Sequence, residues 1–175
     1  MNKNMLYFAY GSNLSTVRLT QRVPSSRLVA SGRLGRHRLV FHKIGRDGSA
    51  KCDAWYTGRR QDYTLGAVYR IDPCHRHLLD AAEGLGNGYE IRNIGIVTDS
   101  GSLMDAFLYT ATAIDRKRKP CHWYKEHVLR GMREHGFPDQ YLAMVEAVEA
   151  TVDADSARTA KELRMYTLPD IIDKA

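Results

Sequence analysis

The sequence predicts one domain of mixed secondary structure, with strands in the first two thirds of the chain and helices near its end. Short runs of β-branched and aromatic residues, separated by turns that contain glycine, continue to about residue 112. Apolar residues then recur at helical spacing between residues 122 and 148. With 175 residues and 43% hydrophobic content, the chain can bury one core and is short for two, so we expect one domain over residues 1–175.

The first predicted strand covers residues 6–10 and runs directly into a turn at 11–13. Residues 15–23 then suit a short helix. Further strand-like runs follow, interrupted by glycines and turn residues, and they cover residues 28–43, 53–57, 64–71, 89–99 and 103–112. A short helix is predicted between two of these strands, where Asp72 suits the N-cap, Pro73 the first helical position and Gly84 the end.

Two longer helices are predicted between residues 121 and 151, separated by the helix-breaking residues 136–138. Each carries an apolar stripe, made of Tyr124, Val128 and Met132 on the first and of Tyr141, Val145 and Val148 on the second. We expect these stripes to cover a sheet. The tail at 164–175 is expected to be strand-like or irregular.

The chain carries a formal charge of +6, from 26 basic and 20 acidic residues, and part of the excess lies in "RLGRHRLVFHK" and "DRKRK". Arg36, Arg38 and His42 in the first stretch alternate with less polar neighbours, as in a strand with one solvated face. Residues 116–119 suit an exposed connection. Because no RNA-binding or helix-turn-helix motif accompanies the charge, we expect no nucleic-acid partner, and the charge can instead attract acidic small molecules.

Membrane and metal sites are not expected either. No apolar run reaches the roughly eighteen residues of a membrane span, and the opening run is too short for a signal peptide, so we expect a cytoplasmic protein. The three cysteines are widely spaced and suggest no disulfide framework or zinc ribbon. Cys74 with His77 and Cys121 with His122 match no standard zinc spacing, so we expect no metal.

Two local features suggest chemistry. In "YGSN" a strand ends abruptly at glycine, whose backbone leaves peptide N–H groups accessible, as in a pocket for an anion or a carbonyl. The alternative is an ordinary loop capped by Ser12 or Asn13. Glu83 stands in the last turn of a helix, where the helix dipole and burial would raise its pKa and make it a better proton acceptor. The alternative is a surface glutamate before a glycine cap.

Together these features resemble the γ-glutamylcyclotransferase family. The similarity lies in "YGSNL" at 10–14, "LDAAEG" around Glu83, "GNGYEI" and the late helical pair from "YKEHV" onward. It covers most of the chain and is weakest at 33–60 and in the last twenty residues. The resemblance implies an α+β fold in which helices surround a small mixed β-barrel with a cavity at its mouth.

The resemblance also implies a site. Glu83 matches the catalytic acid/base of the family. Its substrate loop and pocket tyrosines are matched by Tyr10, Gly11, Ser12, Asn13, Leu14, Tyr89, Tyr109 and Tyr124. From the sequence alone, the favoured interpretation of Tyr89, Tyr109 or Tyr124 taken singly is a core aromatic residue, and only the resemblance places them at the site.

The implied substrate is a small-molecule γ-glutamyl amide, whose own α-amine attacks its γ-carbonyl to form 5-oxoproline and release an amine. Glu83 would move the proton, so this acyl transfer needs no protein nucleophile, metal or organic cofactor. Ser12 lacks the GxSxG context of a nucleophile. Contacts to the leaving amine are expected from the loops around 47–60 and 115–119.

A second function class stays open beside this enzyme. The protein could be a non-catalytic binder that uses the pocket for an anionic ligand, or uses the basic strand for nucleic acid. A carboxylate in the pocket favours the enzyme, because a pure anion binder would gain nothing from it. The oligomeric state, a homodimer included, is left open.

Overall fold

The computed structural model describes residues 5–167, and its centre is a closed barrel. Around the barrel the strands follow the order β1 (Met5–Ala9), β5 (Tyr63–Ile71), β2 (Arg27–Gly35), β6 (Tyr89–Thr98) and β7 (Leu103–Ala111). Neighbouring strands are antiparallel except β1 and β7, which pair in parallel at Tyr7 and Phe107 and close the barrel. The predicted α+β fold with a small mixed barrel is confirmed.

Strands β3 (His37–Ile44) and β4 (Ala50–Tyr56) form a separate two-stranded hairpin. The predicted strand material at 28–43 therefore divides between two sheets, and the break falls at Arg36, which has a φ of 62°. The prediction that His42 lies on a solvated face is wrong. A bulge between Phe41 and Lys43 breaks the alternation of β3, and His42 is buried with only 4% exposure.

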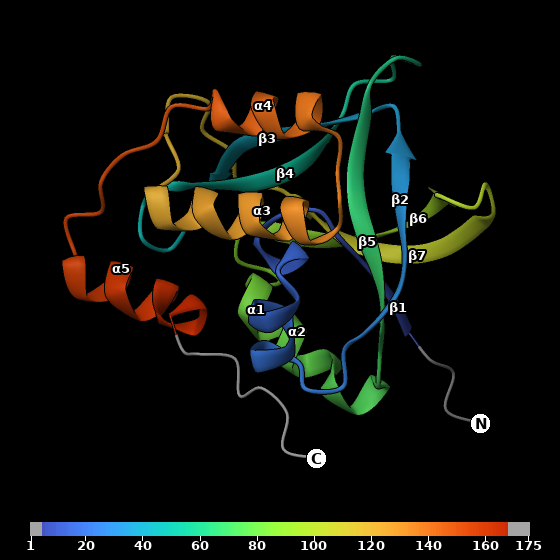
Figure 1. The fold of residues 1–175 in the computed structure, drawn as a ribbon, viewed down its shortest axis with the longest axis horizontal. Helices are drawn as coiled ribbons and strands as arrows, with labels where there is room; N and C mark the ends of the chain where they lie inside the picture. The colour runs from blue at the N-terminus through green and yellow to red at the C-terminus, as the bar shows by residue number, and fades with distance from the viewer. Residues whose placement is uncertain (1–4, 168–175) are drawn as a thin grey trace.

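The helices lie outside the barrel, and Figure 1 shows α3, α4 and α5 together on one side of it. The α-helices are α1 (Thr16–Arg22), α2 (Arg76–Glu83), α3 (His122–Glu134), α4 (Asp139–Glu146) and α5 (Ser156–Leu163). Short 3₁₀ turns are η1 (Ser12–Leu14), η2 (Pro73–His75) and η3 (Arg164–Tyr166). Among residues 5–167, no helix is long and apolar enough to cross a bilayer.

The first four helices were predicted, and α5 was not. Val148, which was expected in the second apolar stripe, lies beyond the end of α4. Of the strand-like or irregular tail expected at 164–175, the described part begins with the 3₁₀ turn η3, which is not a strand. Residues 168–175 lie outside the described part of the chain.

Helix α2 begins and ends as the sequence predicts, apart from a 3₁₀ first turn. The Asp72 side chain accepts a hydrogen bond from Cys74 N at 2.9 Å. Gly84 ends the helix in the left-handed conformation, with a φ of 75°, which a residue with a side chain rarely adopts. Glu83 is therefore the last residue of α2.

The late helices cover the β-structure, as expected. Tyr124 of α3 accepts a hydrogen bond from Cys52 N on β4, and Tyr141 of α4 accepts one from Leu65 N on β5, both at 3.0 Å. Helix α3 also packs against η1 at Gly131. A Cβ atom there would lie 2.3 Å from Leu14 Cβ, so only glycine allows this close approach. Helix α3 thus holds the turn that follows β1 in place from behind.

Candidate active site

The structure brings Glu83 against the turn that follows β1. Asn13 Nδ2 donates a hydrogen bond to Glu83 Oε1 at 2.5 Å, and Tyr7 Oη lies 3.4 Å from the same oxygen. The amide of Asn13 is oriented in turn by Arg22, whose Nη1 donates to Asn13 Oδ1 at 2.9 Å. The neutral side chains of Asn13 and Tyr7 therefore contact the Glu83 carboxylate directly. The Arg22 guanidinium is linked to the carboxylate through Asn13.

Burial raises the pKa of Glu83 above its ordinary value. The positive charges of Arg22, Arg18 and Lys43 and the hydrogen bond from Tyr7 act in the opposite direction without cancelling the effect. The direction agrees with the sequence prediction, and desolvation is its main cause. A carboxylate whose pKa is raised in this way is a stronger proton acceptor than an ordinary glutamate.

Glu83 and the turn line one small inner cavity of about 20 Å³. Its walls include almost all of the predicted site residues, namely Tyr10, Gly11, Ser12, Asn13, Glu83, Tyr89, Tyr109 and Tyr124, with Tyr7 and Cys52 in addition. The volume accommodates about one water-sized group. In the described part of the chain, the backbone N–H groups of residues 11–13 have no hydrogen-bond acceptor.

Leu14 is the predicted site residue that the structure does not place at the cavity. Its side chain is fully buried against α3, and its carbonyl oxygen accepts a hydrogen bond from Tyr69 Oη at 3.2 Å. The motif is continuous in the sequence, but the 3₁₀ turn directs its last side chain into the core. Leu14 thus positions the turn from the core side and does not line the cavity.

The tyrosine rings wall the inner cavity, and their hydroxyl groups are bonded to the protein itself. Tyr89 Oη donates to the Cys52 carbonyl at 2.5 Å, and Tyr124 Oη accepts from Cys52 N. Tyr10 Oη donates to the Tyr109 carbonyl, while Tyr109 Oη donates to Asp80 Oδ1 at 2.5 Å. These bonds hold the rings in fixed positions, which suits a cavity of defined shape.

A larger outer pocket of about 320 Å³ shares Glu83, Tyr89 and Tyr124 with the inner cavity. Six basic side chains line it, namely Arg18, Arg22, Lys43, Arg46, Lys51 and Arg158. Three carboxylates, those of Asp47, Glu83 and Glu162, stand among them. The excess of positive charge fits an anionic ligand that reaches Glu83 from outside.

Several of these residues were missed by sequence reasoning. Arg18 and Arg22 are four residues apart on α1, directly after "YGSNL", and this spacing on one helix face could have indicated them. Tyr7 and Lys43 had no comparable indication. Of the two loops expected to contact the leaving amine, 47–60 contributes Asp47 and Lys51, whereas 115–119 lines other parts of the surface.

The cysteine and histidine residues considered for zinc do not come together. Cys74 is exposed and Cys121 is buried. Over the described residues 5–167, no three His, Cys, Asp or Glu side chains are grouped as metal ligands would be.

Comparison with known proteins assigns the chain to a family. The sequence model of the AIG2-like family matches residues 64–145. Gamma-glutamylcyclotransferase of Mus musculus is 30% identical over 154 residues, which cover 84% of this chain and 80% of the mouse protein. The Homo sapiens protein of that name is 29% identical with the same coverage. A solved structure named gamma-glutamyl cyclotransferase covers 91% of this chain and 99% of its own, with a TM-score of 0.79 and 24% identity. The chain belongs to the γ-glutamylcyclotransferase family.

Proposed function

We propose that this protein converts a γ-glutamyl amide into 5-oxoproline and a free amine, with Glu83 as the general acid and base. The observation that carries the proposal is a carboxylate of raised pKa that lines one cavity together with residues 11–13, whose backbone N–H groups have no acceptor within residues 5–167. This combination supplies a proton acceptor and donors for a developing oxyanion at one place.

In the proposed reaction the α-amine nitrogen of the substrate attacks its own γ-carbonyl carbon and closes a five-membered lactam. Glu83 accepts the proton that the amine loses and then donates it to the departing nitrogen as the original amide bond breaks. The carbonyl oxygen carries negative charge in between. The N–H groups of residues 11–13 would stabilise that charge, an effect of about 3 kcal/mol per donor in comparable sites.

The outer pocket supports a path by which the substrate reaches Glu83 past the basic side chains. The inner cavity, at about 20 Å³, is too small for a whole γ-glutamyl group, whereas the outer pocket has about 320 Å³. We infer that the reacting carbonyl points into the inner cavity while the remaining substrate occupies the outer pocket. The basic side chains there would pair with substrate carboxylates.

The test is release of 5-oxoproline and amine from a panel of γ-glutamyl amides. The matched control is the same amide with its α-amine acetylated, which keeps the scissile bond and removes the nucleophile. We expect turnover of the free-amine substrate alone. Amine release from the acetylated substrate would indicate hydrolysis instead, and binding of both without turnover would indicate a non-catalytic pocket.

A further inference from the structure

A second hollow of about 570 Å³ lies on the β3–β4 hairpin and shares no lining residue with the candidate active site. We call it the hairpin groove. Its apolar wall is made by Val40, Phe41 and Trp55, and its basic wall by Arg38, Arg59 and Arg116. The volume and the mixed lining are those of a ligand site.

Large aromatic side chains are exposed in and beside this groove. Trp55, Tyr56 and Tyr63 have exposed fractions of 36%, 56% and 38%. Two of them carry an arginine over the ring, because Arg116 lies 5.3 Å from the Trp55 centroid and Arg33 lies 5.4 Å from that of Tyr63. Aromatic faces and guanidinium planes are the surfaces on which nucleic-acid bases stack.

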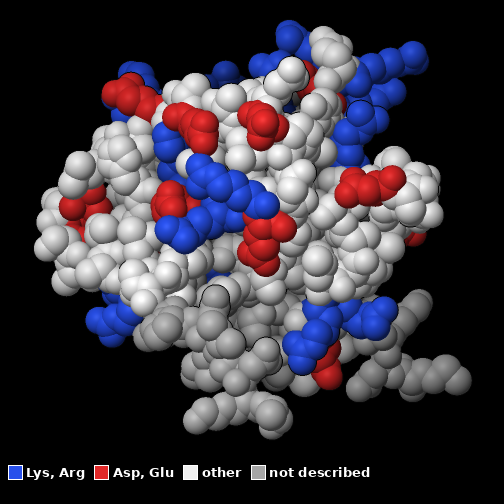
Figure 2. All heavy atoms as spheres, viewed as in Figure 1, with Lys and Arg blue, Asp and Glu red and all other residues white. Residues whose placement is uncertain are grey.

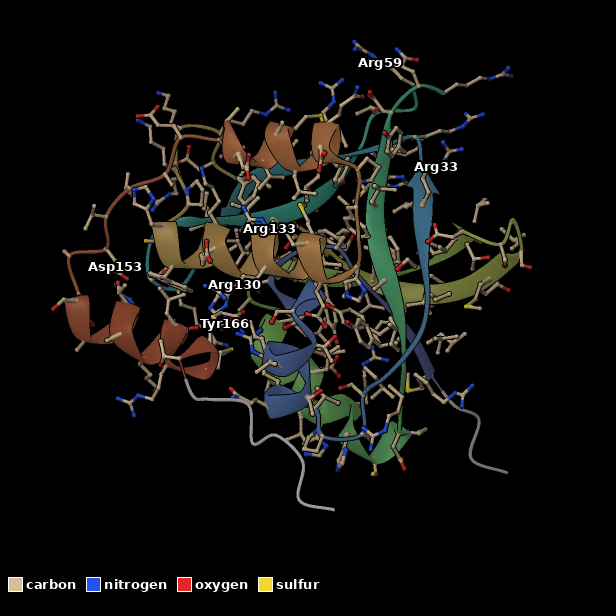
Figure 3. The ribbon with its side chains drawn as sticks, in the orientation of Figure 1. Arg33, Arg59, Arg130, Arg133, Asp153 and Tyr166 are labelled. Carbon is tan, nitrogen blue, oxygen red and sulfur yellow. The ribbon has the colours of Figure 1, made fainter. Side chains whose placement is uncertain are left out.

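Most arginines around the groove lack acidic partners in the part of the chain that the structure describes. Over residues 5–167, no carboxylate forms an ion pair with Arg33, Arg36, Arg59, Arg60 or Arg116. Figure 2 shows basic side chains gathered at the upper right of the molecule, and in Figure 3 Arg33 and Arg59 point outward in that region.

The front of α3 is different, because both of its labelled arginines are paired there. Arg130 lies 2.6 Å from Glu126, and Arg133 lies 2.9 Å from Glu146. The arginines around the groove thus differ from those on α3, although Arg27, Arg70 and Arg164 elsewhere also have no carboxylate partner among residues 5–167.

The basic and aromatic residues form one continuous surface that extends past the groove. Arg36 N donates to the Asp62 carbonyl at 2.7 Å, and Thr57 N donates to the Arg36 carbonyl at 2.9 Å, so the ends of β2, β4 and β5 are joined at this point. Both Asp62 and Thr57 line the groove. A ligand that satisfies all of these groups needs several phosphates and more than one base.

The groove also offers a hydrogen-bonding group that the protein does not use within the described residues. His42 Nε2 lies 2.8 Å from Asp53 Oδ2, and Asp53 Oδ1 accepts from Ala111 N at 2.9 Å. The other ring nitrogen has no partner among residues 5–167 and belongs to a residue that lines the groove.

We propose that the hairpin groove and the adjoining arginines bind single-stranded nucleic acid, with a base stacked at Trp55 and phosphates on Arg36, Arg59, Arg60 and Arg116. The sequence predicted a solvated face for the basic strand because its charges alternate with less polar residues and no nucleic-acid-binding motif accompanies them. The structure adds exposed aromatic rings between the charges, and this combination is characteristic of single-strand binding surfaces.

The test is fluorescence anisotropy of a labelled twelve-nucleotide oligouridine over a range of salt concentrations. Trp55→Leu should weaken binding about 5- to 150-fold, the usual effect of removing one stacking platform. Arg59→Gln with Arg60→Gln should lower the slope of log affinity against log salt by about 0.7 for each phosphate that is no longer neutralised. The charge-matched control is Arg130→Gln with Arg133→Gln on α3, which should leave the slope unchanged.

Each other outcome overturns the proposal. Equal affinity for uridine monophosphate and the oligonucleotide would identify a small-anion site, and an equal weakening in the α3 control would identify unspecific charge attraction. Absence of binding at 50 mM salt would also refute it, as would a dimer in analytical ultracentrifugation that Trp55→Leu dissociates. Cyclotransferase activity should be unchanged in Arg59→Gln with Arg60→Gln, which keeps this proposal separate from the one for Glu83.

Discussion

Two glutamates line the same outer pocket and have opposite electrostatic properties. The pKa of Glu83 is raised by burial, whereas contacts with His127 and Arg18 lower the pKa of Glu162 to about 2. Glu162 Oε2 lies 2.5 Å from Arg18 Nη1 and 3.2 Å from His127 Nε2. Glu83 instead contacts the neutral side chains of Asn13 and Tyr7.

The difference shows that direct pairing, and not the number of nearby cations, determines the role of each carboxylate. Arg22 could have neutralised Glu83, but Asn13 stands between them and accepts the guanidinium hydrogen bond. Glu83 is thus held in place by neutral groups, and the nearby positive charges do not cancel the effect of its desolvation on its pKa. Glu162 remains ionised at neutral pH and ties α5 to Arg18 on α1, which suits a structural role.

The largest expected effect separates the two glutamates by activity. Glu83→Gln keeps the shape of the side chain and removes the proton acceptor, so 5-oxoproline formation should fall by on the order of 10² to 10⁴. Glu162→Gln should reduce activity no more than about tenfold, because its effect would act only through the pocket wall. An equal reduction in the two variants would show that the two glutamates do not differ in role.

The two substitutions should also have different effects on the free energy of unfolding, measured by urea unfolding at pH 7. Glu162→Gln removes the charged partner of the buried Arg18 and should lower the free energy of unfolding by about 1 to 3 kcal/mol. Glu83→Gln removes a carboxylate whose ionisation is disfavoured by burial, so stability should be unchanged or higher.

Lowering the pH should weaken the first of these effects. The pKa of Glu162 is lower in the folded protein, so its contribution is complete above about pH 4.5 and disappears as the pH falls toward 2. Unfolding of wild type and Glu162→Gln between pH 7 and pH 2 measures this, and the gap between the two curves should close. For Glu83 the effect is opposite, because its pKa is higher in the folded protein. Its ionisation should therefore lower the free energy of unfolding as the pH rises above the pKa that it has in the unfolded chain. A gap that stays constant with pH would contradict the ion pair.

A smaller effect is expected from the cation behind Asn13. The positive charge of Arg22 lowers the pKa of Glu83, so Arg22→Gln should move the acidic limb of the kcat/KM profile to higher pH. Lys161→Gln on α5 provides the charge-matched control and should leave the limb in place. A limb that shifts to lower pH in Arg22→Gln would show that a group other than Glu83 titrates.

The smallest effect should come from the neighbour of Asn13. Ser12 lines the inner cavity and, if it only positions the turn, Ser12→Ala should retain activity within about tenfold. Assays of 5-oxoproline release compare it with Glu83→Gln. An inert Ser12→Ala beside an active Glu83→Gln would point to a covalent acyl-enzyme and against the intramolecular reaction.

Predictions based on neighbouring residues were the ones that succeeded in this fold. The end residues of α2 are close together in the chain, so Asp72, Pro73 and Gly84 place Glu83 at a helix end before any tertiary contact is known. Helix α5 was missed although Asp155 caps it through Arg158 N at 2.9 Å. Ala, Arg, Lys, Glu and Leu make up most of α5 and favour a helix, so the capped segment was visible in the sequence and was overlooked.

The placements that the sequence did not anticipate depend on the direction of side chains. Leu14 belongs to a motif whose other members face the cavity, yet a turn and the approach of Gly131 direct it into the core. The bulge in β3 similarly buries His42, and no residue in the sequence marks that bulge. A change of one residue in strand register reverses the face of a side chain, and the sequence pattern alone does not reveal it.

The sequence by itself determined the family resemblance, the order of strands and helices through α4 apart from the division of 28–43 into two strands, and the two local features that meet at the site. Only the tertiary structure decided what surrounds Glu83. Asn13 is 70 residues from Glu83 in the chain, and Arg22 reaches the carboxylate through Asn13. The physical reason is that a pKa depends on desolvation and on charges brought near in space, and both arise when the barrel closes and α1 packs beside α2.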